Sequence, residues 1–374
     1  MKLLYICDAL ANHGGLERVV IDKANWFVEH GGYEVYLLTT NQPGHPVSFP
    51  LHPDVSYYDL GICFHHQYRF SGLRRQVKRL QLKKLFRKRL TEKIAEWSPD
   101  VIICTCFDYL HDIVGVKGGI PLVFESHASR LAALFLGDGL LRRFYVWYSQ
   151  RAVKHAQMVV ALTQGDALEW KKLTPHVCVI PNLVHLNESG LYTDWNAQSA
   201  IFVGRFTKQK DIGSLLRIWS LVYQRHPDWR LHIYGESGEE QASLLEKIKQ
   251  MDANIQVHKP TPDIIEKYRE SSVMLLTSVC EPFGLVLPEA MSCGLPVIAF
   301  DCPYGPADII TEGVDGFLIQ DRSIEAYAEK VSLLIEHQEL RRKMGTAGIA
   351  STRRYEASNV MPLWKELFTR LANK

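Results

Sequence analysis

EPFGLVLPEAMSCGLPVI, residues 281–298, follows a short apolar segment at residues 273–277. The pattern predicts a buried strand, a loop, a helix that Pro288 opens and Gly294 ends, and a second buried strand at residues 296–300. A loop between a strand and a crossover helix lies at the carboxyl edge of a parallel sheet, where open α/β folds bind ligands. Glu281 in the loop and Glu289 at the helix start are therefore candidate ligand-binding carboxylates, although helix capping would account for both equally well.

The same loop offers backbone N–H groups at Phe283, Gly284 and Leu285, just before the predicted helix. Such groups have no intrahelical acceptor, so they are available to sugar hydroxyls or phosphate oxygens. Glu289 has the complementary property, because a carboxylate accepts hydrogen bonds from a ribose diol.

The longer string EPFGLVLPEAMSCGLPVIAFDCPYGPADII, residues 281–310, resembles the E-x7-E signature of the family-4 retaining glycosyltransferases. The resemblance implies the GT-B fold, an α/β architecture of two Rossmann-like domains facing a central cleft, with a C-terminal helix that crosses back to the N-terminal domain. It also implies that Glu281 contacts the hydroxyls of the donor sugar and Glu289 the nucleotide ribose. The turn at residues 302–306 is similar to a subgroup common among enzymes of polysaccharide and lipid-linked oligosaccharide synthesis.

A second match to this family lies after the predicted strand at residues 199–203. Gly204, Arg205 and Lys210 have the spacing of the family's G-R-x4-K loop. Two cations that leave a strand end together suit a pyrophosphate. Without the resemblance they would be an ordinary surface pair.

The N-terminal half contributes a glycine turn and a histidine. Gly14 and Gly15 lie between a predicted strand at residues 2–7 and a helix at 16–30, an arrangement that also occurs in dinucleotide-binding dehydrogenases. The third glycine of the dehydrogenase pattern is absent. The resemblance implies instead that Gly14 and Gly15 face the donor diphosphate, and that His127, which would otherwise be an ordinary structural histidine, lies near the transferred sugar.

Length and composition bound the architecture. A chain of 374 residues exceeds the size at which one core usually keeps growing, so we expect two domains. The resemblance implies that these are an N-terminal acceptor-binding domain at 1–185 and a nucleotide-sugar-binding domain at 186–355, followed by a helix at 356–374 that packs back on the N-terminal domain. Eight cysteines without a C-x-x-C pair indicate reduced thiols rather than a disulfide framework or a zinc site. No apolar run approaches the roughly 18 residues of a spanning helix.

Basic charge is concentrated in one segment. Between Arg69 and Lys93 there are eleven Lys or Arg and one acid, although the whole chain carries a net charge of only +2. The segment predicts an amphipathic helix at 72–97 whose apolar side is formed by Leu73, Val77, Leu80, Phe86, Leu90, Ile94 and Trp97. The cations predicted to meet an anionic membrane are Arg74, Arg75, Lys78, Arg79, Lys83, Lys84, Arg87 and Lys88.

The basic segment is also compatible with a solvated helix face and with nucleic-acid binding, but no nucleic-acid motif accompanies it. A second apolar stretch, residues 131–156, predicts either a lipid-facing acceptor surface or a buried helix.

The resemblance, taken with these features, implies a retaining glycosyltransferase that moves a hexose or N-acetylhexosamine from a nucleotide-sugar to a lipid-linked or growing glycan in bacterial-type surface polysaccharide synthesis. UDP is expected from the resembled subgroup. His127, Glu281, Arg205 and Lys210 are the predicted catalytic residues. The sequence has no D-x-D motif, so we expect no metal, and the nucleotide-sugar is a substrate rather than a cofactor. The expected location is cytoplasmic, at the inner face of the cell membrane. The alternatives are a GT-B nucleotide-sugar epimerase and a non-enzymatic protein that binds membranes or polyanions.

Overall fold

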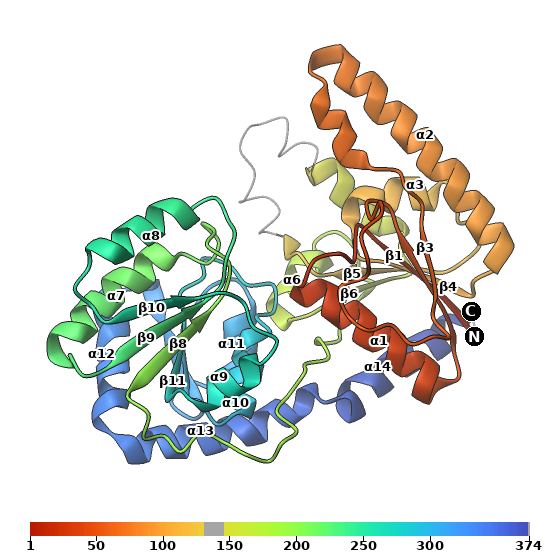
Figure 1. The fold of residues 1–374 in the computed structure, drawn as a ribbon. Coiled ribbons are helices and arrows are strands. Elements are labelled where there is room, and N and C mark those ends of the chain that lie inside the picture. Colours follow the sequence, from red (N-terminus) through yellow and green to blue (C-terminus); the bar gives the residue numbers. More distant parts are fainter. Residues whose placement is uncertain (131–145, 373–374) are drawn as a thin grey trace. The chain divides into compact units, whose positions relative to one another are not determined.

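The computed structural model describes residues 1–130 and 146–372, which form two compact α/β units (Figure 1). Unit 1 comprises Met1–Leu183 together with Val360–Lys374, and unit 2 comprises Val184–Asn359. The apolar stretch predicted at 131–156 lies mostly outside the described residues, so its role stays a prediction. No helix in the described ranges is both long enough and apolar enough to cross a membrane.

Unit 1 contains a parallel sheet of seven strands in the order β3-β2-β1-β4-β5-β6-β7. The strands are β1 (Lys2–Cys7), β2 (Glu34–Thr39), β3 (Ser56–Asp59), β4 (Val101–Cys104), β5 (Leu122–Ser126), β6 (Met158–Ala161) and β7 (Val177–Val179). Its helical elements are α1 (Gly15–Gly31), η1 (Phe64–Arg69), α2 (Gly72–Trp97), η2 (Phe107–Tyr109), α3 (Leu110–Val114), η3 (Arg151–His155), α6 (Gln164–Lys171) and, from the chain end, α14 (Ala357–Ala372). The strand order reverses between β1 and β4, which is the position where such sheets bind ligands.

Unit 2 contains a parallel sheet of six strands in the order β10-β9-β8-β11-β12-β13. The strands are β8 (Ser199–Val203), β9 (Arg230–Tyr234), β10 (Ile255–His258), β11 (Val273–Leu276), β12 (Val297–Phe300) and β13 (Gly316–Ile319). The helical elements are α7 (Ile212–Arg225), α8 (Gln241–Gln250), α9 (Ile264–Arg269), α10 (Val286–Ser292), α11 (Gly305–Ile309), η4 (Gln320–Arg322), α12 (Ile324–Glu336), α13 (Gln338–Thr352) and η5 (Arg353–Tyr355). The reversal point of this sheet lies between β8 and β11.

The segment from β11 to β12 has the predicted order of strand, loop, helix and strand. Both strands are buried along their whole length, as expected of parallel strands covered on two faces. Helix α10 begins at Val286, so Pro288 lies in its first turn, where a missing N–H leaves no hydrogen bond unmade. Gly294 follows the helix with a φ of +85°, a conformation that glycine adopts without strain.

Helix α14 belongs to unit 1 from Val360 on, although it follows unit 2 in sequence. Its buried residues include Trp364 and Phe368, and the Phe368 ring lies 5.5 Å from that of Phe27 on α1. The chain end therefore completes the apolar core of the N-terminal unit.

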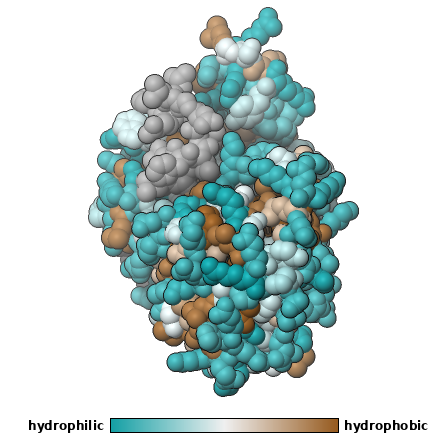
Figure 2. All heavy atoms as spheres, turned by 90° about the vertical axis from the view of Figure 1, so that its left-hand side faces the viewer, coloured by the Kyte–Doolittle hydropathy of each residue, from teal (hydrophilic) through white to brown (hydrophobic). Residues whose placement is uncertain are grey.

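Helix α2 contradicts the single apolar side predicted for it. Leu82, Phe86 and Leu90 face the core, whereas Leu73 is 80% exposed and Leu80 is 67% exposed. At about 100° per residue, the buried and exposed sets lie roughly half a turn apart. Figure 2 shows apolar side chains among hydrophilic ones at the top of the view, where α2 lies. The basic helix thus carries a second apolar stripe that faces solvent.

Candidate functional site

The glycine turn of unit 1 lies at the end of β1, beside the reversal point of the sheet. Gly14 is the N-cap of α1 and Gly15 is the first residue of that helix. A β-carbon on Gly14 would lie 2.5 Å from Glu17 Oε2, so this side chain would have to move for any larger residue. The turn places a helix start at the edge where phosphates bind in other parallel folds.

His127 follows β5 and is paired with a carboxylate. Its Nε2 lies 3.0 Å from Glu125 Oε1, and the two side chains are 6% and 1% exposed. The same carboxylate forms an ion pair with Lys23 of α1, whose side chain is 1% exposed. Burial would raise the pKa of Glu125, but Lys23 and His127 outweigh burial and lower this pKa to about 2. Glu125 is therefore a carboxylate that joins a buried lysine to the predicted catalytic histidine.

Hydrogen bonds on the other side of the strand end hold the loop around His127. Asp166 accepts hydrogen bonds from Ser126 Oγ, Trp170 Nε1 and the backbone N–H of Arg130, each at 2.9 Å. Burial raises the pKa of Asp166, and these three donors oppose that rise. The loop at residues 126–130 is thus fixed at both of its ends.

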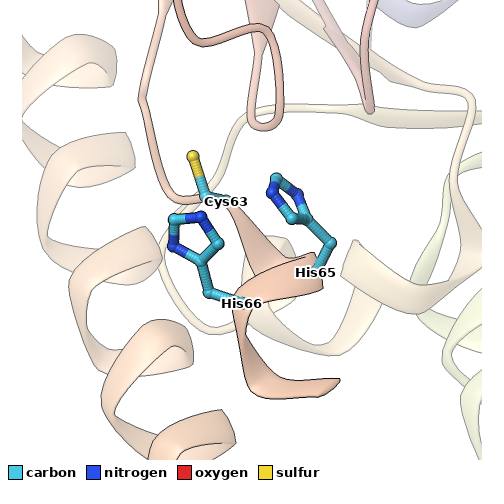
Figure 3. Close-up of side chains that lie close together, drawn as sticks. All are labelled: Cys63, His65 and His66. Atoms are coloured by element: carbon cyan, nitrogen blue, oxygen red, sulfur yellow. The ribbon is translucent and has the colours of Figure 1, made fainter. Parts of the chain in front are cut away.

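A cluster of possible metal ligands lies elsewhere in unit 1. Cys63, His65 and His66 lie in and before η1, with their ligand atoms within 4.8 Å of one another (Figure 3). The group contains no carboxylate. Burial lowers the pKa of His66, and the nearby positive charges of Arg69 and Lys78 lower it further. Positive neighbours oppose the binding of a divalent cation. None of the residues predicted to bind the nucleotide-sugar belongs to this cluster.

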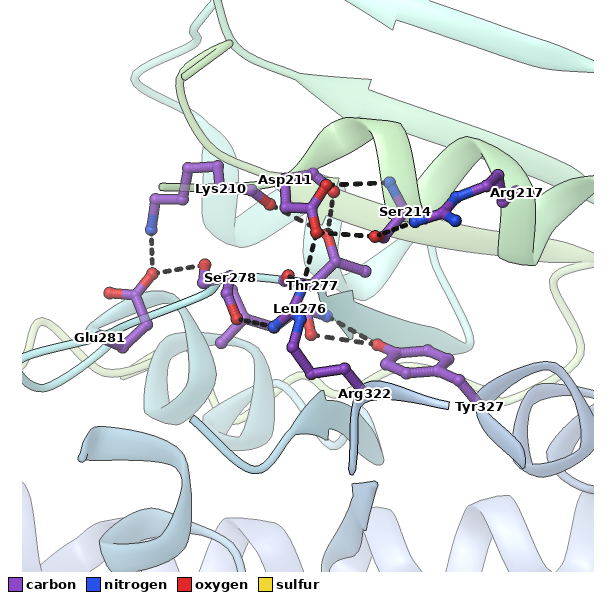
Figure 4. A network of polar contacts seen from close by, with 10 residues as sticks. All are labelled: Lys210, Asp211, Ser214, Arg217, Leu276, Thr277, Ser278, Glu281, Arg322 and Tyr327. Carbon is purple, nitrogen blue, oxygen red and sulfur yellow. Dashed lines mark hydrogen bonds and ion pairs between the residues drawn. The ribbon is translucent and has the colours of Figure 1, made fainter. Parts of the chain in front are cut away.

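Two predicted site residues meet in unit 2, at the reversal point between β8 and β11. Lys210 forms an ion pair with Glu281 Oε1, which also accepts a hydrogen bond from Ser278 Oγ at 2.7 Å (Figure 4). Only 15% of the Lys210 side chain and 6% of the Glu281 side chain are exposed. The loops that follow the two central strands thus present one shielded ion pair at the ligand-binding edge.

Hydrogen bonds join these two loops along their length. Thr277 Oγ1 donates to the backbone oxygens of Lys210 at 3.0 Å and Asp211 at 3.1 Å. Gln209 accepts from the Val279 N–H at 2.8 Å through its backbone, and its side chain donates to the Cys280 oxygen at 3.0 Å. The position of Lys210 against Glu281 is therefore set by the surrounding backbone.

Arg322 is a site residue that the sequence did not reveal. Its guanidinium donates to Asp211 Oδ2 at 2.6 Å and to the backbone oxygens of Ser278 at 2.8 Å and Thr277 at 2.9 Å (Figure 4). Asp211 in turn caps α7 by accepting from the Ser214 N–H at 3.1 Å. Because Arg322 bridges both loops, it holds the carboxyl edge of the sheet together.

The loop from Glu281 to Leu285 is pressed against the turn at residues 302–306. The Glu281 N–H donates to Pro303 O at 2.8 Å, and Glu281 O accepts from the Tyr304 and Gly305 N–H groups, each at 2.8 Å. A β-carbon on Gly305 would lie 1.8 Å from Phe283 O, so the close approach requires glycine here. Phe283 is buried, and Gly284 has a φ of +93°.

The remaining predicted residues of unit 2 lie around this pair without joining it. Arg205 is exposed, and Gly204 packs so closely under Gly235 that a β-carbon on Gly235 would lie 2.0 Å from the Gly204 oxygen. Glu289 is half-buried in the first turn of α10 and accepts from Tyr268 Oη at 3.4 Å. The two acids of the 281–298 segment therefore have different partners, Lys210 for Glu281 and Tyr268 for Glu289.

Most of the chain is similar in sequence to known glycosyltransferases. Residues 13–188 match the family model described as Glycosyltransferase Family 4, and residues 194–351 match that described as Glycosyl transferases group 1. The amylovoran biosynthesis glycosyltransferase AmsD of Erwinia amylovora is 29% identical, covering 98% of this chain and 99% of that protein. The lipopolysaccharide 1,6-galactosyltransferase of Escherichia coli K12 is 26% identical over 91% of this chain and 92% of its own length.

Solved structures share the fold across the whole chain. The sucrose-phosphate synthase of Thermosynechococcus elongatus has a TM-score of 0.82 at 15% identity and covers 99% of both chains. Anabaena HepE, solved with UDP and glucose, has a TM-score of 0.74 at 16% identity and covers 98% of this chain and 99% of its own. The predicted two-domain fold and the predicted activity class are thus confirmed, and the chain belongs to the glycosyltransferases of the GT-B fold.

Proposed function

We propose that this glycosyltransferase is retaining and metal-independent, and that it moves a hexose or N-acetylhexosamine from a UDP-sugar to a lipid-linked or growing glycan of a surface polysaccharide. The observation that carries the proposal is the shielded ion pair of Lys210 and Glu281 at the reversal point of the unit 2 sheet. Relatives named for amylovoran and lipopolysaccharide synthesis support the acceptor class, and a neighbour solved with UDP and glucose supports the donor class.

Each residue around the pair would bind a different part of the donor. Lys210 and the exposed Arg205 supply positive charge for the diphosphate, and the N–H groups from Phe283 to Leu285 add hydrogen-bond donors. Glu281 accepts hydrogen bonds from the sugar hydroxyls, and Glu289 accepts them from the ribose. Lys210 already neutralises Glu281 before the donor binds. Donor binding would therefore give these two charged side chains new partners.

The proposed reaction breaks the bond between the sugar C1 and the diphosphate oxygen. The departing diphosphate gains negative charge, which Lys210 and Arg205 stabilise. The acceptor hydroxyl attacks C1 from the same face and passes its proton to the leaving phosphate oxygen, which retains the anomeric configuration. A nucleotide-sugar epimerase would instead convert the donor without an acceptor, and product analysis separates the two activities.

Peripheral binding to the inner face of the membrane is the second part of the proposal. The solvent-facing stripe of α2 combines Leu73, Val77 and Leu80 with Lys84 and Lys88 one to two turns later. Apolar side chains beside cations suit an anionic lipid surface. Two cations of the sequence prediction have another role, because Lys83 and Arg87 both pair with the buried Asp112, at 2.9 and 2.6 Å.

UDP is expected to raise the melting temperature of the protein selectively. A ligand at 100 times its dissociation constant adds about 2.7 kcal/mol of stability. Scanning fluorimetry with UDP, GDP and NAD measures this, and Glu289→Ala is expected to weaken the response because it removes the ribose acceptor. Well-folded protein that does not respond to UDP would contradict the donor assignment.

Replacing Arg322 by Gln is expected to loosen both loops and weaken UDP binding. The lost charged hydrogen bonds correspond to about 1 to 2 kcal/mol of unfolding free energy, measurable by urea denaturation, and UDP titration gives the affinity. Arg217→Gln is the matched control, since Arg217 touches the network only through Ser214 Oγ, at 2.9 Å. Equal effects of the two substitutions would show that Arg322 has no special role.

Vesicle sedimentation tests the membrane surface. Leu73→Ser/Leu80→Ser and Lys84→Gln/Lys88→Gln are each expected to weaken binding to vesicles of phosphatidylglycerol and phosphatidylcholine, the latter pair by about 2 kcal/mol or roughly 30-fold. The control Lys247→Gln/Lys249→Gln neutralises two exposed lysines on α8 and is expected to change nothing. Unchanged binding of both α2 variants would refute this surface.

A further inference from the structure

Lys23 is a buried charge at a place where four elements of unit 1 meet. Its Nζ forms the ion pair with Glu125 of β5 and lies 4.4 Å from the ring centroid of Trp364 on α14 and 5.6 Å from that of Tyr5 on β1. An ammonium removed from water is costly unless it is paired. Aromatic faces add a favourable cation–π contribution to the pair. The ammonium group of Lys23 thus contacts side chains from β1, β5 and α14.

Glu125 connects this charge to His127 through a single oxygen. Oε1 contacts both Lys23 Nζ and His127 Nε2, the latter at 3.0 Å. His127 Nε2 faces this carboxylate in close ion-pair contact, outside hydrogen-bond geometry, so Nδ1 is left for another partner. The orientation and tautomer of His127 therefore depend on where Glu125 points, and Lys23 fixes that direction.

The titratable groups that face Glu125 are Lys23 on α1, Tyr5 and Cys7 on β1, and His127 in the following loop. Burial raises the pKa of Tyr5 well above its usual value and the pKa of Cys7 to about 12, so both are neutral at ordinary pH. Burial lowers the pKa of Lys23, and Glu125 opposes that change. Each member of the ion pair thus favours the charged form of the other.

We propose that Lys23 is a positioning residue for His127, acting through Glu125, and that Trp364 holds Lys23 in place. The proposal rests on the proposed function and on the role that the family resemblance implies for His127, close to the transferred sugar. A buried ion pair seldom adds stability compared with apolar residues of the same volume. A function in orienting His127 explains why a charged pair occupies this position.

Lys23→Met removes the charge and keeps the length of the side chain. We expect kcat to fall roughly 10- to 100-fold, as for a displaced catalytic group, while the dissociation constant of UDP changes less than about twofold because Lys210, Arg205 and Glu289, which we propose to bind UDP, belong to unit 2. Without Lys23, burial raises the pKa of Glu125, so the carboxylate ionises only at higher pH. The ratio of variant to wild-type rate should therefore increase as pH rises.

The double variant Lys23→Met/Glu125→Gln separates positioning from stability. It leaves no unpaired buried carboxylate, so its melting temperature should recover relative to Lys23→Met. Its kcat should stay low and its rate ratio should not vary with pH, because an amide can donate or accept and does not fix the imidazole. Recovery of both stability and kcat would show that Lys23 is only structural and would overturn the proposal.

Trp364→Leu tests the contribution of the C-terminal helix. We expect a lower kcat and a rate ratio that does not vary with pH, because Lys23 still keeps Glu125 ionised. The control Leu371→Ala removes buried apolar volume from the same helix and should lower stability alone, because Leu371 is 5% exposed in the core. If both substitutions lowered kcat equally, measured well below the melting temperatures of the variants, Trp364 would have no specific role in holding Lys23.

Nitrogen-15 NMR of the imidazoles gives a readout that needs no substrate. The proposal predicts that His127 is the Nε2–H tautomer in the wild type and a mixture of tautomers in Lys23→Met. An unchanged His127 signal would overturn the positioning role even if the enzyme transfers sugar. Failure of the proposed function would appear separately, as absence of UDP binding with the imidazole shift intact.

Discussion

A carboxylate that folding removes from water needs compensating partners, and in each unit of this protein one such carboxylate near the carboxyl edge of the sheet is paired with a lysine. Glu281 is paired with Lys210 in unit 2, and Glu125 is paired with Lys23 in unit 1. Desolvation of each ion costs several kcal/mol, which the attraction between the partners offsets only with good geometry. Such pairs contribute little to stability compared with apolar residues of the same volume, which is why we propose functional roles for both of them.

The topology of the parallel sheets explains where the unit 2 pair lies. Strands that reverse their order leave two neighbouring loops directed away from each other, and the space between them accepts a ligand. The unit 2 loops after β8 and β11 carry Lys210 and Glu281, and Arg322 joins them. In unit 1 the glycine turn follows β1 at the corresponding reversal point. The positions of these candidate site residues therefore follow from where the chain crosses from one half of the sheet to the other.

Sequence reasoning predicted the features that depend on local pattern. The strand, loop and helix around Glu281 follow from apolar runs with Pro288 and Gly294 between them, and the two-domain GT-B fold followed from the resemblance of that segment. Lys23 was not predicted, because a lysine in an amphipathic helix is typical of a surface residue until Glu125, 102 positions later, is placed beside it. Arg322 was not predicted for the same reason, since its partner Asp211 is 111 positions away.

The basic helix shows a different limit of sequence patterns. Leu73, Val77 and Leu80 have helical spacing among themselves, and so do Leu82, Phe86 and Leu90, but the two sets occupy opposite faces of α2. Periodicity identified the helix and its cations, whereas only the packing of the core distinguishes the buried stripe from the exposed one. Similarly, Asp112 determines that Lys83 and Arg87 are structural cations.

The central claim is that Lys210 binds the diphosphate of the donor and Glu281 binds its sugar. Calorimetric titration of Glu281→Gln tests it most directly. The ligands are UDP and whichever of UDP-glucose, UDP-galactose and UDP-N-acetylglucosamine the wild type binds most tightly. The account predicts that the variant keeps its affinity for UDP within about threefold, because Lys210 still meets the diphosphate, and loses the added affinity for the sugar. Loss of UDP affinity together with an undiminished preference for the UDP-sugar would contradict it.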